Sequence, residues 1–122
     1  MPLTTNGSLE MLKAYLGEGN TPMTEANTTI GVGNGATAFS VADTALVGAS
    51  QEFNAIDAGF PQRNSAVVTF QATFGPSEAL FNWTEYGIKV GATLISRKVE
   101  TLGNKDLVSQ TWIFIITSTQ AA

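Results

Sequence analysis

The segment from Leu107 to Ser118 constrains the fold of this chain more than any other part of the sequence. Its residues, Leu-Val-Ser-Gln-Thr-Trp-Ile-Phe-Ile-Ile-Thr-Ser, are mostly the β-branched and aromatic types that favour strands. From Trp112 onward both faces of such a strand are apolar, so we expect it to lie centrally in a sheet, covered on both sides. The most apolar stretch, Trp112 to Ile116, is too short to span a bilayer, so no membrane partner is expected.

Shorter segments elsewhere also have strand character. Residues 66–74 alternate strictly between two faces, one of which carries Val68, Phe70, Ala72 and Phe74. Further strands are expected over 28–32, 51–57, 80–90 (with a bulge near Gly87) and 93–97, with turns at 61–64, 91–92 and 103–106. Short strands separated by turns about every ten residues predict a mainly β protein. We expect an antiparallel β-sandwich, or a barrel-like variant of it, that forms a single domain over residues 1–122.

One helix is predicted, over residues 6–16. Leu9, Leu12 and Leu16 recur at the spacing of one helical face, and we expect this face to bury against a sheet. Candidate caps are Thr5 or Asn6 at the start and Gly17 or Gly19 at the end. Residues 33–50 are small and flexible in composition, and within them Asp43 is placed to cap a single helical turn that Leu46 would anchor.

The composition removes most routes to catalysis. The chain has no His and no Cys, which excludes Ser-His-Asp and Cys-His catalysis and leaves no thiolate chemistry. Carboxylates alone rarely form a zinc site, and no Asp-x-Asp-x-Asp loop indicates calcium. The six basic residues are scattered and the net charge is −4, so no phosphate-binding stripe is present. We therefore expect no enzyme activity, no cofactor, no metal and no nucleic-acid partner.

Four carboxylates lie near the ends of predicted strands: Glu78, Glu85, Glu100 and Asp106. Paired carboxylates can act as acid and base, but solvated charges at turns explain this pattern better. Glu85 is the exception, because it stands between Trp83 and Tyr86 in an otherwise apolar strand. We expect it to pair with Lys89 or Arg97 across the hairpin, in a structural role.

A glycine-rich tract, Gly31-Val-Gly-Asn-Gly-Ala36, matches the G-x-G-x-x-A dinucleotide fingerprint. A dinucleotide-binding unit needs a long amphipathic helix directly after this motif, and residues 37–42 have no helical stripe. We therefore interpret Gly31, Gly33 and Gly35 as positions where the backbone turns tightly.

The order of these segments resembles a group of small virion proteins of tailed bacteriophages, often described as tail-fibre or tail-associated proteins. The resemblance lies in the N-terminal helix, Ile30–Gly35, Asp43–Leu46, a strand ending in Phe74-Gly-Pro76, Thr84–Ile88, Leu94–Arg97 and Trp112-x-Phe-x-Ile116. It implies a β-sandwich present in many copies on a virion that is assembled in the bacterial cytoplasm. It also implies that Gly31 to Gly35 form a tight connector, that Asp43 and Leu46 pin the next loop, and that Glu85 and Gly87 shape a strand.

The sequence leaves three functions open. The leading one is a non-enzymatic tail, tail-fibre or baseplate protein that forms a homo-oligomer, with a trimer favoured, and contacts other virion proteins. The second is a capsid decoration protein, and the third is a carbohydrate-binding module that uses Trp83 or Tyr86. Contacts are expected over residues 31–50 and 118–122. The structural and contact candidates are Leu9, Leu12, Leu16, Gly31, Gly33, Gly35, Asp43, Leu46, Glu85, Gly87, Arg97 and Trp112.

Overall fold

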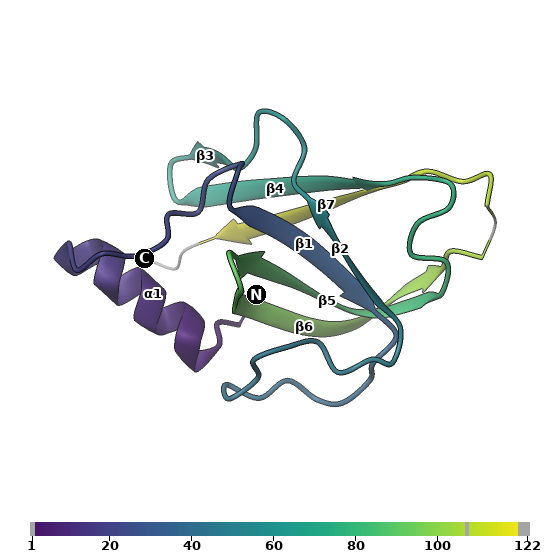
Figure 1. Cartoon of the computed structure of the whole chain (residues 1–122), viewed down its shortest axis with the longest axis horizontal. Helices are drawn as coiled ribbons and strands as arrows, with labels where there is room; N and C mark the ends of the chain where they lie inside the picture. The colour runs from purple at the N-terminus through teal and green to yellow at the C-terminus, as the bar shows by residue number, and fades with distance from the viewer. Residues whose placement is uncertain (1, 107, 120–122) are drawn as a thin grey trace.

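The computed structural model describes residues 2–106 and 108–119, which form one helix and seven strands (Figure 1). The elements are α1 (Thr5–Leu16), β1 (Thr28–Gly33), β2 (Gln51–Ala55), β3 (Gln62–Asn64), β4 (Val67–Phe74), β5 (Asn82–Val90), β6 (Thr93–Asn104) and β7 (Trp112–Thr119). No helix within these ranges has the length and apolar character needed to cross a membrane.

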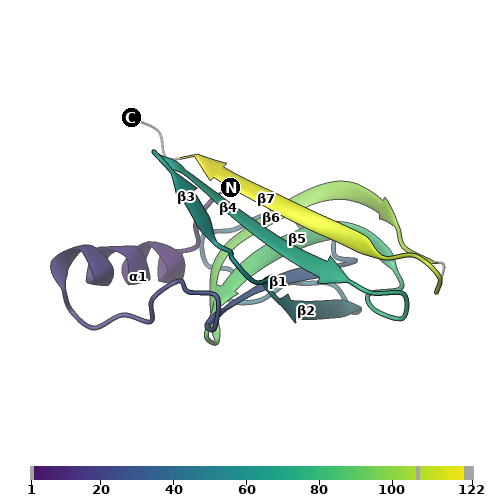
Figure 2. The ribbon, with the colours of Figure 1, turned by 90° about the horizontal axis from the view of Figure 1, so that it is seen from above.

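The strands form two antiparallel sheets. One sheet has the order β2-β1-β5-β6 and the other the order β3-β4-β7. Figure 2 shows the three-stranded sheet lying across the four-stranded one, so that the two make the layers of a sandwich. The expected mainly β, antiparallel sandwich with one short helix is thereby confirmed.

The core fills the space between the two sheets. Strand β4 alternates as predicted and buries Phe70, Ala72 and Phe74. The other buried members of this core are Ile30, Val32, Ile56, Ala79, Trp83, Tyr86, Ile88 and Ile116. Aromatic rings meet edge to face at its centre, with centroids 5.0 Å apart for Phe74 and Trp83 and 4.9 Å apart for Tyr86 and Phe114. Such pairs add directional packing to the burial of apolar area.

Strand β7 was expected to lie centrally in a sheet, and this expectation was wrong. Among the described residues β7 pairs with β4 alone, so it is an edge strand and not a central one. It begins at Trp112, and the expected start at Leu107 lies outside the described residues. Ile113 and Ile115 are 59% and 55% exposed on the outer face of the sheet. Apolar residues on both faces of a strand indicate that both faces can be buried. They do not indicate whether the same chain or another molecule buries them.

The helix α1 is present where it was predicted, with a different N-cap. Thr4 caps it: the Thr4 hydroxyl accepts a hydrogen bond from the Gly7 amide at 2.9 Å and donates one to the Leu94 carbonyl at 2.6 Å. Gly17 takes the left-handed conformation at the C-terminus, with φ of 70°. The same threonine thus starts the helix and fastens it to β6.

The leucine face of α1 is not buried, contrary to expectation. Leu9, Leu12 and Leu16 are 47%, 59% and 64% exposed. The helix contacts β6 through its first turn, where Gly7 lies against the backbone of Ile95. Beyond that turn α1 extends beside the end of the sandwich and does not lie over a sheet face (Figure 1). The spacing predicted the helix correctly, but the helix is attached by one end.

Three smaller expectations also differ from the structure. Residues 61–64 contain the short strand β3, because Gln62–Asn64 finds a partner in β4. The expected turn at 103–106 begins later, because β6 continues to Asn104 by pairing with the start of β5. Residues 43–47 form no helical turn. The bulge expected near Gly87 corresponds to two irregularities of the β5–β6 pairing, one on either side of that glycine.

Gly7→Ala tests the attachment of the helix. A Cβ atom at this position would collide with the Ile95 carbonyl oxygen. We expect the substitution to lower the free energy of unfolding by about 1–3 kcal/mol, the usual cost of overpacking, although alanine is the better helix former. Urea unfolding followed by circular dichroism would measure it, with Ser8→Ala as an exposed control that changes stability by less than about 0.5 kcal/mol. Equal stability of Gly7→Ala and the wild type would contradict this docking.

Candidate functional site

The most elaborate polar arrangement in the described part of the chain surrounds Glu85 of β5. We call it the Glu85 cluster and define it as Glu85, Arg97, Asp43 and the segment 34–48 that they hold. Glu85 and Arg97 have no exposed side-chain surface. They lie on neighbouring strands, β5 and β6, and the segment 34–48 connects β1 towards β2. The cluster therefore joins the centre of the four-stranded sheet to the longest irregular connection next to it.

The Glu85 carboxylate accepts four hydrogen bonds. Its Oε1 accepts from Arg97 Nε at 2.8 Å and from the Val47 amide at 3.0 Å. Its Oε2 accepts from the amides of Gly35 at 2.9 Å and Gly48 at 2.6 Å. Four donors match the acceptor capacity of an ionised carboxylate, so the buried charge is fully satisfied.

Of the two partners proposed from the sequence, Arg97 is the one that pairs with Glu85. Lys89 instead places its ammonium group 4.1 Å from the centre of the Phe53 ring. This is the geometry of a cation–π interaction.

Arg97 carries the network from the sheet into the loop. Its Nη1 donates to Asp43 Oδ2 at 3.0 Å and its Nη2 donates to the Thr37 carbonyl at 2.7 Å. Asp43 Oδ2 also accepts from the Ser40 amide at 3.0 Å. The Asp43 carboxylate is thus occupied by Arg97 and by a turn of its own, which explains why it caps no helix at residues 43–47.

The expectation that the backbone turns tightly at Gly31 and Gly33 was wrong, because both glycines lie within the extended strand β1 and pair with β2 and β5. The role of the glycines in this tract is steric. A Cβ atom on Gly33 or Gly35 would press on the Glu85 carboxylate. Gly87 faces Leu46, which is buried as expected, and Gly31 lies under the Phe53 ring. Seven predicted residues therefore come together here: Gly33, Gly35, Asp43, Leu46, Glu85, Gly87 and Arg97. The glycine-rich tract lets its backbone approach a carboxylate of the protein itself.

The surroundings of Glu85 set its protonation state. Burial by itself would raise the pKa of this carboxyl group, but the hydrogen bonds from Val47, Arg97, Gly48 and Gly35 outweigh burial and lower the pKa below its usual value. Glu85 is therefore ionised at neutral pH. With its oxygens enclosed by protein donors, it is suited to clamping a loop and not to exchanging protons with a substrate.

The other carboxylates considered in the sequence are structural or solvated. Glu78 accepts from the Gly75 amide at 2.7 Å and from Asn54 at 3.1 Å. Glu100 pairs with Lys98 in the solvent, and Asp106 is exposed. Within residues 2–106 and 108–119, no three His, Cys, Asp or Glu side chains are grouped so that they could hold a metal ion.

Sequence reasoning missed one buried cation. Lys105 is fully buried, and its Nζ donates to the carbonyls of Gly75 at 2.7 Å and Glu78 at 2.8 Å. It thereby ties the end of β6 to the connection between β4 and β5. Nothing in the sequence Gly-Asn-Lys-Asp distinguishes this lysine from an ordinary charged residue in a turn.

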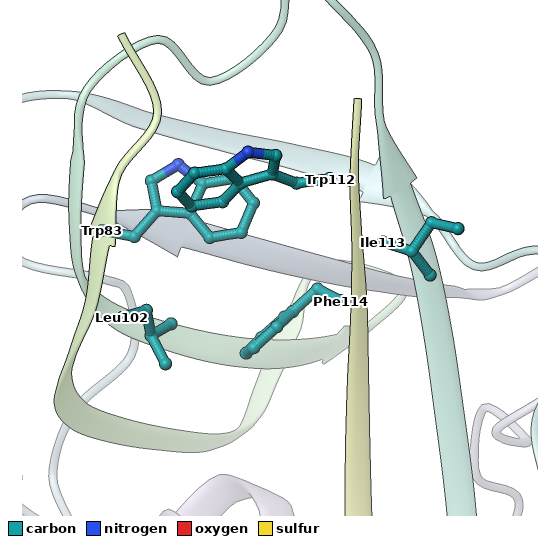
Figure 3. A pocket seen from close by; sticks show the side chains of 5 residues that line it. All are labelled: Trp83, Leu102, Trp112, Ile113 and Phe114. Carbon is teal, nitrogen blue, oxygen red and sulfur yellow. The ribbon is translucent and has the colours of Figure 1, made fainter. Parts of the chain in front are cut away.

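Trp112 contributes to an aromatic pocket between β7 and the end of the β5–β6 pair. The pocket has a volume of about 380 Å³ and is lined by Trp83, Leu102, Trp112, Ile113 and Phe114 (Figure 3). Figure 3 shows the two tryptophan rings beside each other, whereas the Ile113 side chain lies on the opposite side of β7. Trp83 is buried and its Nε1 donates to the Ala79 carbonyl at 2.9 Å. Tyr86 is also buried, so neither ring proposed for sugar stacking is accessible to a glycan.

The remaining predicted residues, Leu9, Leu12 and Leu16, lie on an apolar surface of the helix. We call this surface the α1 face and define it as Leu9, Leu12, Tyr15 and Leu16, all of which are exposed. Beside it lies a shallow pocket of about 410 Å³, whose walls include Leu3, Leu9, Leu12 and Val41. Large exposed side chains that gather in this way are typical of surfaces that bind other macromolecules.

Glu85→Gln tests the central role of the carboxylate. The amide keeps the shape of the side chain but leaves the Arg97 guanidinium buried without its closest counter-charge. We expect a loss of about 3–5 kcal/mol in the free energy of unfolding, the usual result of breaking a buried ion pair. The matched control is Glu100→Gln in the exposed pair with Lys98, which should change stability little. Equal effects of the two substitutions in urea unfolding would contradict the assignment.

The pH dependence of stability tests the same carboxylate. The pKa of Glu85 is lower in the folded state than in the unfolded chain, whose value is about 4.3. Its contribution to stability is therefore complete above about pH 4.3 and is lost as the pH falls through the folded-state pKa. We expect the stability difference between the wild type and Glu85→Gln to stay constant from pH 7 to about pH 5 and to shrink in more acidic solution. Urea unfolding at a series of pH values would measure it, and a difference that grows on acidification would refute it.

No protein-family model, curated protein or solved structure matches this chain. The features of the chain that bear on its function are therefore its buried Glu85 cluster and its uncovered apolar surfaces.

Proposed function

We propose that this chain is a non-enzymatic structural protein of a tailed-bacteriophage virion, associated with the tail, tail fibre or baseplate. It acts through contacts with copies of itself, for which the sequence favours a trimer, and through contacts with neighbouring virion proteins. It is assembled into the particle in the cytoplasm of the bacterial host. The observation that carries this proposal is the combination of a buried ion pair, Glu85–Arg97, whose donors and acceptors are occupied by the protein itself, with uncovered apolar surface.

The internal polar groups support a structural role. All four acceptor positions of Glu85 are filled by protein donors, and Arg97 is held by Glu85, Asp43 and the Thr37 carbonyl. The buried Lys105 ammonium group likewise donates to two backbone carbonyls of the protein. Catalytic groups need access to a substrate and a proton that can move. Glu85, Arg97 and Lys105 have neither access to a substrate nor a proton free to move, and their hydrogen bonds stabilise loops.

The surface supports a role in assembly. Apolar side chains are exposed on two separate elements, the α1 face and the outer face of β7. Tyr15 is 89% exposed and Leu16 is 64% exposed, far more than residues of their size in a protein core. Assembly into a particle would bury such side chains at interfaces, whose centres are more apolar than the rest of the protein surface and are enriched in aromatic residues. The virion setting is supported by the order of segments from the N-terminal helix to Trp112-x-Phe-x-Ile116, which resembles that of small tailed-bacteriophage virion proteins.

Co-sedimentation with phage particles tests this proposal. Purified protein would be mixed separately with tails and with empty capsids of a phage that encodes the chain, and the bound fraction would be measured over a range of protein concentrations. We expect the free protein to self-associate and to bind tails saturably. Leu12→Lys on the α1 face should weaken the binding to tails. The exposed substitution Ser77→Lys, in the turn after β4, is the matched control and should bind normally.

The other outcomes of this experiment are also decisive. Saturable binding to capsids and not to tails would identify a capsid decoration protein. A chain that binds neither structure would contradict a role in the virion.

A further inference from the structure

Strand β7 presents an open edge. It pairs with β4 along its full length, from Trp112 opposite Phe74 to Thr119 opposite Val67, and no other described strand lies on its far side. Proteins usually protect such edges with Lys, Pro, bulges or very short strands, because the unpaired backbone groups are a template for another strand. Residues 112–119, Trp-Ile-Phe-Ile-Ile-Thr-Ser-Thr, contain no charge, no Pro and no Gly. This edge is therefore unprotected, and Ile113 and Ile115 are exposed beside it.

The sequence of this edge is nearly the same in both directions. Residues 111–117, which are Thr111 just before β7 and the first six residues of the strand, read Thr-Trp-Ile-Phe-Ile-Ile-Thr, with Phe114 at the centre. When two antiparallel copies are placed with Phe114 opposite Phe114, Ile113 of one copy faces Ile115 of the other, and Thr111 faces Thr117. Trp112 faces Ile116, which is the one pair that departs from the symmetry. Cross-strand pairs of β-branched and aromatic residues are the combinations that stabilise a sheet.

In this register, residues that face each other across the two edges point to the same side of the sheet. Their backbone N–H and C=O groups are also placed to form hydrogen bonds between the strands. Partners are both odd-numbered or both even-numbered, and residues two apart along a strand point to the same side. The isoleucines at positions 113 and 115 of both copies therefore meet on the outer face. The residues that face the core in one copy continue the core-facing side of the other.

Charge also favours a second copy at this edge over other places on the surface. The chain has a net charge of −4, so two copies repel each other in general. The strand from Trp112 to Thr119 carries no charged side chain, and thus two such edges meet without like-charge repulsion. A neutral edge complements another copy of itself, whereas a charged partner would gain nothing there.

We infer that β7 is a self-association surface, through which two copies join antiparallel about a two-fold axis at Phe114. The two three-stranded sheets become one continuous sheet, and the contact is isologous, as in most homodimers. This inference deepens the proposed function and rests on its homo-oligomeric part. It gives a dimer as the basic unit, where the sequence favoured a trimer.

The size of the edge sets the strength of the contact. Seven residues at about 3.3 Å each give an edge about 23 Å long. One strand edge covers less area than the roughly 1,600 Å² of a standard stable interface. We therefore expect a weak dimer that forms at micromolar or higher protein concentration and dissociates on dilution.

Sedimentation over a concentration series tests the surface. The average mass of the wild type should rise towards that of a dimer, whereas Ile113→Lys and Ile115→Lys should remain monomeric. Both isoleucines are exposed, so their replacement should leave the fold intact, which circular dichroism would verify. The controls are Val108→Lys, at a 65% exposed apolar position outside the strand, and Leu12→Lys on the α1 face. Both controls should dimerise like the wild type.

The opposite results would overturn the inference without deciding whether the chain associates with phage tails, which co-sedimentation tests separately. If Leu12→Lys abolished association and Ile113→Lys did not, the chain would assemble through its helix and the edge assignment would be wrong. A wild type that stays monomeric at every concentration would also overturn it. In both cases binding to tails would still be judged by co-sedimentation.

Cysteine pairs test the register. The chain has no cysteine, so an introduced thiol reports on the designed contact alone. In the two-fold register position 113 faces position 115, while equal positions are diagonal neighbours about 7–8 Å apart, too far for a disulfide. A mixture of Ile113→Cys and Ile115→Cys, distinguished by a tag on one of them, should form mixed disulfide dimers on oxidation, and each variant alone should not. Equal cross-linking of the separate variants, or none in the mixture, would overturn this register.

Discussion

The buried ion pair between Glu85 and Arg97 is the interaction on which the arrangement of this protein depends. Removing two charges from water is unfavourable unless each is surrounded by good hydrogen bonds. Here three backbone amides of the segment 34–48 donate the remaining hydrogen bonds to the Glu85 carboxylate. Asp43 and the Thr37 carbonyl accept the remaining hydrogen bonds of the Arg97 guanidinium. The loop and the ion pair therefore require each other. The segment 34–48, which is rich in small residues, is held in one conformation by the Glu85 carboxylate. The buried carboxylate in turn needs the amides of this segment as hydrogen-bond donors.

The sequence predicted those parts of the fold that local patterns determine. Strict alternation identified β4 and its buried face, and turn residues located the β5–β6 hairpin. Glu85 stood out because a carboxylate between two aromatic residues of an apolar strand needs a partner. The position of β7 and the environment of the α1 leucines were not predictable in the same way. Their patterns show which side chains favour burial, but burial can be completed inside the chain or by another molecule, and local sequence does not distinguish the two.

The two apolar surfaces arise from how their elements are attached. Helix α1 is fastened to β6 by its first turn, so most of its length lies beyond the sheet. Strand β7 closes one side of the smaller sheet, and it buries Ile116 while Ile113 remains outside. Each element contributes one side to the folded chain and offers the other to its surroundings. The described residues thus form a complete sandwich and leave apolar side chains of α1 and β7 exposed, a feature typical of surfaces that bind other macromolecules.

The segment around Thr44 and Ala45 illustrates what the anchored loop permits. Both residues are exposed, and they lie between Asp43, held by Arg97, and the buried Leu46, which precedes the Val47 amide held by Glu85. Because the Glu85–Arg97 ion pair holds both ends, extra residues inserted between Thr44 and Ala45 would lengthen a closed loop whose two ends stay anchored to the same pair. The free-energy cost of closing a flexible loop, which is entropic, grows slowly, by about 0.6 kcal/mol for each doubling of the loop length. The hydrogen bonds that Arg97 and Glu85 make on either side of Thr44 and Ala45 thus make these two residues a site where foreign peptides can be inserted and displayed on the sandwich.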